Sequence, residues 1–235
     1  GLVGDLDEKA AIDVVARNFG ALPKRKNRRD DYIAARESRF SEAYGVHTLL
    51  HRGEANQLTW RRVWATTDDS DFRQEQTLSL LADILQIRLI DELRENLGAT
   101  YGASTSSDMS DVYKDRGMFS ISTNGDLKDL EKIESTIDAV IAEILSAPVS
   151  NDLFERARKP TLEKFADWRK RNPTWIGIVD EAQTAPDRLQ RFRDSESQFR
   201  TITSKEVWEA AKRYLLADRS YTFRVLPKAA DRPEN

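Results

Sequence analysis

The sequence predicts an α+β domain in which helices cover one face of a mostly antiparallel sheet of about five to six strands. Two observations predict this class. Short segments of alternating residues, typical of strands, arrive in pairs, and longer segments with apolar residues at helical spacing separate the pairs. The sequence also lacks a repeat with a period of roughly 20–50 residues, which excludes a solenoid.

The first segment combines the end of a strand with a helix. Leu2 and Val3, followed by a turn, have the pattern of a strand's last residues. Because the chain opens without Met, we expect a piece of a longer protein whose first strand is truncated. A remnant of expression at Gly1 is the alternative, and both can hold. The helix that follows has an apolar face and a glycine at its end: Ala11, Ile12, Val15, Phe19 and Gly20.

Two strands and a long helix come next. The strands are predicted at residues 46–52 and 58–65, on either side of a short polar segment. Asp71 with Gln74 resembles a capping box at the start of the helix, and Gly98 ends it. The helix carries an apolar stripe so wide that we expect burial on more than one side: Leu78, Leu81, Ile84, Leu85, Ile87, Leu89, Ile90 and Leu93.

Residues 99–107 and 117–124 alternate as two further strands, which we expect to be antiparallel neighbours. A helix with isoleucines on one face is predicted from Asp126 to about Ala147, where Pro148 ends it.

The stretch from 150 to 218 is expected to be helical throughout and broken into short pieces by Pro160, Pro173 and Pro186. Thr203 and Glu206 form a capping box before the last helix. An alternating strand at residues 221–225 closes the fold. We therefore expect a single domain over residues 1–227, followed by a polar tail at 228–235.

Charge and composition exclude several classes of function. The 37 Lys and Arg residues nearly balance 40 Asp and Glu residues, so neither a nucleic acid nor a membrane surface is expected as a partner. The basic run at 24–29 precedes Asp30 and Asp31 and contains no aromatic residues, which favours a solvated connector. Without cysteine, the chain has no disulfide, thiolate metal site or cysteine nucleophile. No apolar run approaches roughly 18 residues, and no signal peptide is visible.

A zinc site within the chain is not expected. His47, His51 and Glu54 would share one face of a helix and could then bind zinc. Their segment has a strand pattern, however, and residues four apart in a strand lie roughly 13 Å apart. The H-x-x-E-H motif of inverted zincins is absent as well.

The segment with the clearest functional character joins the long helix to the next strand. Arg94 lies in the last helical turn, Tyr101 opens the strand, and Gly98 turns the chain between them. The two polar tips are expected to approach each other, where they would supply hydrogen-bond donors to a peptide carbonyl or a developing oxyanion. Both residues also suit purely structural roles, since an arginine complements the helix dipole and a tyrosine favours strands.

This segment, Leu-Arg-Glu-x-Leu-Gly-x-x-Tyr, resembles a helix-to-strand signature in the second half of insulinase/pitrilysin-type zinc peptidases. Short motifs at residues 3–5, 19–23, 52–54 and 223–227 agree with that family in order. The resemblance covers essentially the whole chain, and the region from Phe154 to Tyr214 is most similar to bacterial periplasmic zinc proteases.

The resemblance implies a metallohydrolase domain of the insulinase and mitochondrial processing peptidase type, in the C-terminal position and without the zinc motif. In that family, four related domains close around a chamber, and the first half binds zinc and supplies a Glu as general base. The second half lends an Arg and a Tyr, here Arg94 and Tyr101. The resemblance also implies a peptide substrate, zinc in the parent enzyme, a zinc-bearing N-terminal half in the same or a separate chain, and a periplasmic location. This chain alone is expected to be inactive.

Two other functions remain open. The same fold serves as a non-catalytic structural or partner subunit. A stand-alone peptide-binding module is the second alternative, because an exposed sheet edge would accept a partner strand or form a homodimer.

Overall fold

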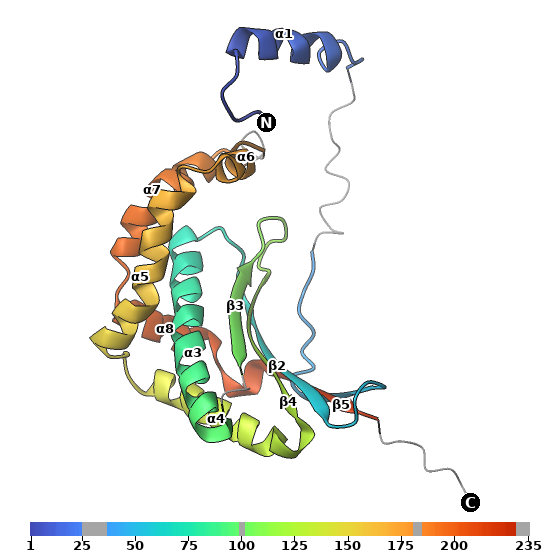
Figure 1. Cartoon of the computed structure of the whole chain (residues 1–235), viewed down its shortest axis with the longest axis vertical. Helices are drawn as coiled ribbons and strands as arrows, with labels where there is room; N and C mark the ends of the chain where they lie inside the picture. The colour runs from blue at the N-terminus through green and yellow to red at the C-terminus, as the bar shows by residue number, and fades with distance from the viewer. Residues whose placement is uncertain (25–36, 99–101, 181–184, 229–235) are drawn as a thin grey trace, which may run out of the picture.

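The computed structural model describes residues 1–24, 37–98, 102–180 and 185–228. A twisted sheet lies beside a layer of helices, so the α+β class is confirmed and the helices do cover one face of the sheet (Figure 1). The helix α1 lies apart from both layers, beyond α6.

Five strands form one sheet in the order β1-β5-β2-β4-β3. From one edge to the other they are β1 (Gly45–His51), β5 (Ser220–Pro227), β2 (Gln57–Thr66), β4 (Gly117–Asp126) and β3 (Ala103–Met109). Each strand lies close to its expected position. The pairing of β3 with β4 is antiparallel, as predicted, with Ala103 opposite Thr123.

The prediction of a mostly antiparallel sheet is wrong, because the sheet is mixed. β1 and β5 run parallel, with His47 opposite Phe223, while β5 pairs antiparallel with β2 and β2 with β4. The last strand of the chain lies between β1 and β2, which therefore do not pair with each other. Patterns within a short segment favour neighbouring strands as partners, and they contain no information on a strand that returns from far along the chain.

The helix α3 (Phe72–Leu97) is the centre of the core. Its expected leucine stripe is fully buried, from Leu78 to Leu93. It contacts β3 on one side and the helices α4, α5 and α8 on others, which explains why its apolar surface is wider than one stripe. From the sheet, Trp60, Trp64 and Phe119 pack into the same core.

A polar anchor holds α4 (Leu130–Ser146) against the sheet, after a short 3-10 turn η1 (Leu127–Asp129). Glu134 accepts hydrogen bonds from Trp60 Nε1 at 2.9 Å and from two nitrogens of Arg224 at 2.7 Å each. One turn later, Asp138 pairs with Arg62 at 2.5 Å. Two carboxylates of one helix therefore bind side chains of β2 and β5.

The helices α5 (Asn151–Trp168), α6 (Asn172–Asp180) and α7 (Arg188–Arg200) form an arm that extends past one end of α3 (Figure 1). The expected break at Pro160 is wrong, because α5 runs through it. A proline inside a helix removes one backbone hydrogen bond, and buried Ala157 and Phe165 anchor the helix on both sides of it. Pro173 and Pro186 do lie where helices begin, as expected.

The helix α8 (Ser204–Tyr214) carries the predicted capping box. Thr203 and Glu206 exchange hydrogen bonds between side chain and backbone. Glu206 also forms an ion pair with Arg73 of α3 at 2.7 Å, so the cap fastens α8 to the central helix. A short 3-10 turn, η2 (Ala217–Arg219), then leads into β5.

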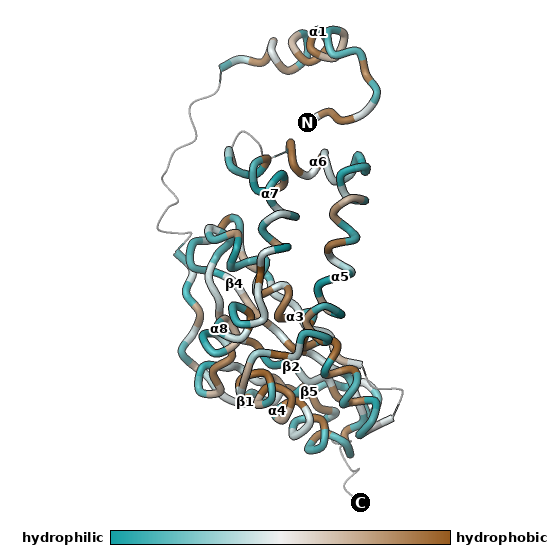
Figure 2. The backbone as a smooth tube through the Cα atoms, turned by 90° about the vertical axis from the view of Figure 1, so that its left-hand side faces the viewer, coloured by the Kyte–Doolittle hydropathy of each residue, from teal (hydrophilic) through white to brown (hydrophobic). Residues whose placement is uncertain are grey.

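The helix α1 (Glu8–Asn18) has no buried residue. Hydrophobic and hydrophilic residues alternate along it (Figure 2). The apolar side chains of this segment are largely exposed: Leu2, Leu6, Ile12, Val14, Val15, Phe19 and Leu22. Leu2 and Val3, expected as the end of a strand, have no regular structure.

Candidate functional site

Arg94 lies in the last turn of α3, and its side chain is exposed. The helix ends at Gly98, whose N–H donates to the Arg94 carbonyl at 3.0 Å and whose φ of 100° is accessible mainly to glycine. Lys132 of α4 donates to the carbonyl oxygen of Asn96, which fixes the same end of α3 to α4. Within the described residues, the Arg94 guanidinium has no hydrogen bond or ion pair.

The start of β3 is fastened to α3 by one glutamine. Gln86 donates to the carbonyl of Ala103 and accepts from the N–H of Thr105 at 2.8 Å. On the other side, Thr123 of β4 donates to the carbonyl of Gly102 at 2.7 Å. The short connection from Gly98 to Gly102 is therefore fixed at both ends.

Tyr101 lies outside the described residues, which resume at Gly102. The predicted approach of Arg94 and Tyr101 therefore stays a prediction.

Beside this region, an ion-pair cluster joins α3 to α4. Arg88 binds Glu92 at 2.8 Å and Glu143 at 2.7 Å. The hydrogen bond to Glu143 raises the pKa of Arg88, with Glu92 adding to the effect against partial burial. These ion pairs stabilise the packing of α4 against α3, the helix that carries Arg94.

The face of the sheet away from the helices is rich in hydroxyl groups, and the sequence analysis missed it. Ser106 and Ser120 hydrogen-bond across β3 and β4 at 3.1 Å, and Arg61 of β2 donates to Ser120 at 3.3 Å. Ser104 lies opposite Ser122 in the next register position on the same face. Alternating serines in both strands were the available signal.

The two histidines do not fit a metal site. Both lie on β1, as expected for a strand. His47 Nε2 lies 2.8 Å from the carbonyl of Ala43, and His51 Nε2 lies 2.9 Å from the carbonyl of Gln57. Among the described residues, no group of three or more His, Cys, Asp or Glu side chains is placed to hold a metal ion.

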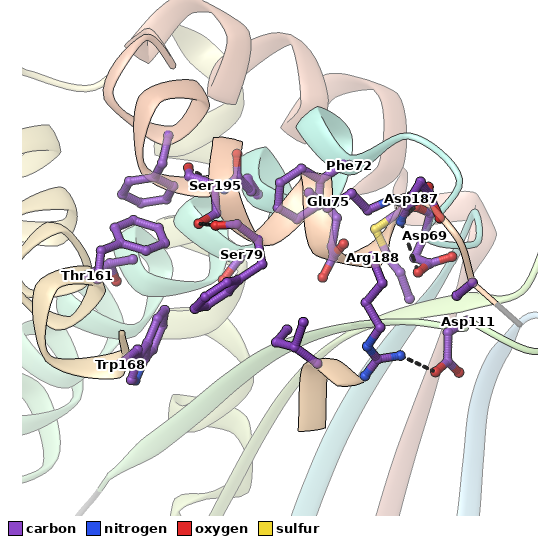
Figure 3. A pocket seen from close by; sticks show the side chains of 18 of the residues that line it. Asp69, Phe72, Glu75, Ser79, Asp111, Thr161, Trp168, Asp187, Arg188 and Ser195 are labelled. Carbon is purple, nitrogen blue, oxygen red and sulfur yellow. Dashed lines mark hydrogen bonds and ion pairs between the residues drawn. The ribbon is translucent and has the colours of Figure 1, made fainter. Parts of the chain in front are cut away.

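A cavity at the opposite end of α3, between α3, α5, α6 and α7, was also missed (Figure 3). It has a volume of about 770 Å³. No single stretch of sequence contains its lining, which comes from segments between residues 69 and 199.

Comparison with known proteins gives a family match. The sequence matches the family described as "Peptidase M16 inactive domain" over residues 1–160. The chloroplastic stromal processing peptidase of Oryza sativa subsp. indica is 28% identical over 109 residues, which make up 46% of this chain and 9% of that peptidase.

Solved structures share the fold. The periplasmic protease PqqL from Escherichia coli has a TM-score of 0.74 at 14% identity, covering 96% of this chain and 25% of PqqL. The inactive peptidase domain of a protein described as a zinc protease, from Bordetella parapertussis, has a TM-score of 0.63 at 21% identity, covering 77% of this chain and 98% of that domain. This chain therefore corresponds to a small part of the rice peptidase and a quarter of PqqL.

Proposed function

Because this chain belongs to the peptidase M16 inactive-domain family, we propose that it is the C-terminal domain of a zinc metalloendopeptidase whose zinc is bound by another domain. The match over residues 1–160 carries the proposal. The fold shared with a domain of a periplasmic protease and with a domain of a protein described as a zinc protease supports it.

Zinc belongs to the other half of the parent enzyme. His47 and His51 are engaged with backbone carbonyls and lie four residues apart on a strand, so they are not suited to bind one ion together. We therefore assign no step of peptide hydrolysis to a metal on this chain.

The face of the sheet away from the helices supplies a wall for a peptide-binding chamber, at the β3 edge where Ser104 is exposed. The exposed Ser104 hydroxyl, the half-buried Ser106 hydroxyl and the exposed Arg61 guanidinium offer hydrogen-bond donors and acceptors to an extended peptide backbone. Polar groups on one face and a helix-covered core on the other suit a sheet that encloses substrate on one side only.

Arg94 and Tyr101 supply donors near the scissile bond. The exposed guanidinium of Arg94 at the end of α3 supports this role for the arginine. A guanidinium and a phenol would orient the peptide carbonyl and stabilise the oxyanion that develops as water attacks.

The N-terminal half of the parent enzyme is the partner. The exposed apolar side chains of α1 are the surface that we assign to it, since a helix with a bare apolar face is stabilised by burial against another body. We also propose a periplasmic location, which the fold shared with PqqL supports. No described helix is long and apolar enough to cross a membrane.

The test is to measure zinc content and peptidase activity of this chain alone and after mixing with the zinc-bearing half of the parent protein. We expect no zinc and no cleavage with the chain alone, and zinc-dependent cleavage in the mixture. Stoichiometric zinc in the isolated chain would overturn the assignment of zinc to the other half. An intact but inactive complex would favour the structural subunit, and a stable homodimer that does not bind the zinc-bearing half would favour the stand-alone module.

A further inference from the structure

The cavity at the N-terminal end of α3 has the features of a separate binding site. It is bounded by the first turns of α3, by α5, α6 and α7, and by the β3–β4 loop, and it measures about 770 Å³. Glu75 and Arg94 are 19 residues apart on α3, which corresponds to about 28 Å along the helix. The cavity is therefore distinct from the end of α3 that carries Arg94.

The charges that line the cavity do not balance. Among the described residues of the lining, four carboxylates face two guanidiniums. Arg191 pairs with Asp187 at 2.6 Å and with Asp69 at 3.1 Å, and Arg188 lies 4.0 Å from Asp111. The fourth carboxylate, Glu75, makes no hydrogen bond or ion pair with any residue that the structure describes.

Glu75 is directed into the open centre of the cavity, with Trp168 and Thr161 on one side and Arg188 and Asp111 on the other (Figure 3). Burial raises the pKa of Glu75, and the negative charges of Asp69 and Asp111 raise it further against the opposite effect of Arg191. A positive charge placed near a carboxylate in such surroundings stabilises its ionised form.

A second polar group in the lining also lacks a partner. Gln76 is only 8% exposed, and its Nε2 donates to the carbonyl of Ser195 at 2.8 Å. That bond fixes the side-chain amide, while its Oε1 is buried and accepts no hydrogen bond from the described residues. A buried acceptor without a donor is costly, but a ligand in the cavity reaches this oxygen only if the side chain moves.

The walls of the cavity are aromatic. Five rings line it, from α3, α5 and α7: Phe72, Phe165, Trp168, Phe192 and Phe199. Phe165 packs edge-to-face against Trp168 at 5.4 Å and against Phe199 at 5.7 Å. Rings of this kind contact hydrocarbon chains and attract cations to their faces.

We propose that this cavity binds an alkyl cation, an ammonium or guanidinium group at the end of a flexible apolar chain. The cation pairs with Glu75, and the apolar chain lies between the aromatic rings. An anion is disfavoured, because both arginines are already engaged with carboxylates and Glu75 would repel it. A free amine and a lysine or arginine side chain of a peptide share this chemistry.

Calorimetric titration of the full chain tests the proposal. The probes are n-pentylamine, the equally long 1-pentanol and pentanoate, and Nα-acetyl-lysine methylamide. We expect saturable binding of pentylamine, and roughly tenfold weaker binding to Glu75→Gln, because a charge-assisted hydrogen bond is lost. Glu131→Gln, an exposed change on α4, is the matched control and is expected to bind as the native chain does.

Each possible result either supports the proposal or overturns it. Equal binding of pentylamine and pentanol would show an apolar cleft without charge selection and overturn the proposal. Undiminished pentylamine binding to Glu75→Gln, with thermal unfolding confirming a folded variant, would overturn it as well. If pentylamine binds and acetyl-lysine methylamide binds with equal affinity, the natural ligand is a peptide side chain. If pentylamine binds and acetyl-lysine methylamide does not, the natural ligand is a free amine. None of these measurements depends on peptidase activity, so the result stands apart from the proposed function.

Discussion

Glu75 and Glu206 are both carboxylates of the helical layer, and their pKa values shift in opposite directions. Burial raises the pKa of Glu75, and the positive charge of Arg191, which opposes the rise, does not outweigh it. Burial also acts to raise the pKa of Glu206, but hydrogen bonds from Arg73 and Thr203 outweigh it, and the net shift is downward. The difference lies in the donors that each side chain reaches, and not in the depth of burial alone.

Ionised Glu75 is expected to destabilise the native state. Its folded pKa lies above the ordinary value of 4.5, so the folded chain binds more protons than the unfolded chain over the interval between the two values. The stability that Glu75 contributes in its protonated form is lost as the pH rises through that interval. Glu75→Gln should therefore raise the melting temperature at neutral pH and have little effect below pH 4.5. Melting curves against pH measure this, and an equal effect at all pH values would contradict it.

Arg94 and Tyr101 are expected to act on turnover in the parent enzyme. Arg94→Ala or Tyr101→Phe should lower kcat roughly 10²–10³-fold, as measured for the loss of one donor to an oxyanion. Melting temperature should hardly change with Arg94→Ala, since the side chain is exposed. Arg219→Ala, at another exposed arginine near a helical turn, is the control. Unchanged turnover in both site variants would remove the proposed role.

At the level of elements, the capping box of α8 stabilises more than its own helix. Glu206 accepts hydrogen bonds from the backbone N–H and hydroxyl of Thr203 and pairs with Arg73. Because the folded pKa of Glu206 is lowered, its stabilisation is present above 4.5 and is lost as the pH falls through the folded value. Thr203→Ala should cost about 1 kcal/mol at neutral pH. Urea unfolding measures the loss, with the exposed Lys205→Ala as control.

The attachment of α4 to the sheet depends on Glu134. Its side chain is 17% exposed and accepts hydrogen bonds from Trp60 Nε1 and from Nε and Nη2 of Arg224. Glu134→Ala leaves the Trp60 N–H and the guanidinium without an acceptor, so we expect a loss of about 2 kcal/mol in the free energy of unfolding. Glu163→Ala removes a surface carboxylate 4.0 Å from Lys159 and should cost less than about 0.5 kcal/mol. Equal losses in the two variants would contradict this account.

Elements were predictable where one segment contains its own signal. The leucines of α3, the capping box of Thr203 and the alternation of β4 are local patterns, and the structure confirms all three. The insertion of β5 between β1 and β2 was not predictable, because it depends on a pairing such as Leu49 with Val225, far apart along the chain. The predicted break at Pro160 was wrong for a related reason, since buried neighbours decide whether a helix continues through a proline.

In the whole molecule, the candidate sites differ in how far the sequence revealed them. Arg94 was found because a short motif carries the family resemblance, and the structure confirms its place at the end of α3. The cation cavity was not found, because Glu75, Trp168 and Arg188 converge only when α3, α5 and α7 pack together. The serine-rich sheet face was visible as alternation in β3 and β4, but its exposure depends on which face the helices cover.

The exposed apolar face of α1 sets apart the first 24 residues from the rest of the molecule. Elsewhere in the molecule a large cluster of apolar side chains is buried around α3, whereas no residue of α1 is buried. Burial of a Val or Leu side chain stabilises by roughly 1.5–3 kcal/mol, so an amphipathic helix whose apolar face is exposed lacks a large stabilising contribution. Contact with the zinc-bearing half would bury this face and supply that contribution.

This contact leads to the last prediction. Val15→Glu places a charge on the apolar face of α1, where the native side chain is 43% exposed in this chain. Because nothing is buried there, unfolding of the chain alone should be unchanged within about 0.5 kcal/mol. Association with the zinc-bearing half should weaken at least roughly tenfold, since the charge would be buried without a partner.

Val112→Glu makes the same change at a side chain 60% exposed in the β3–β4 loop and should leave association unaltered. Sedimentation velocity with the two polypeptides measures both effects. Equal weakening by the two variants would indicate a general effect of charge, and no weakening by Val15→Glu would place the partner surface elsewhere.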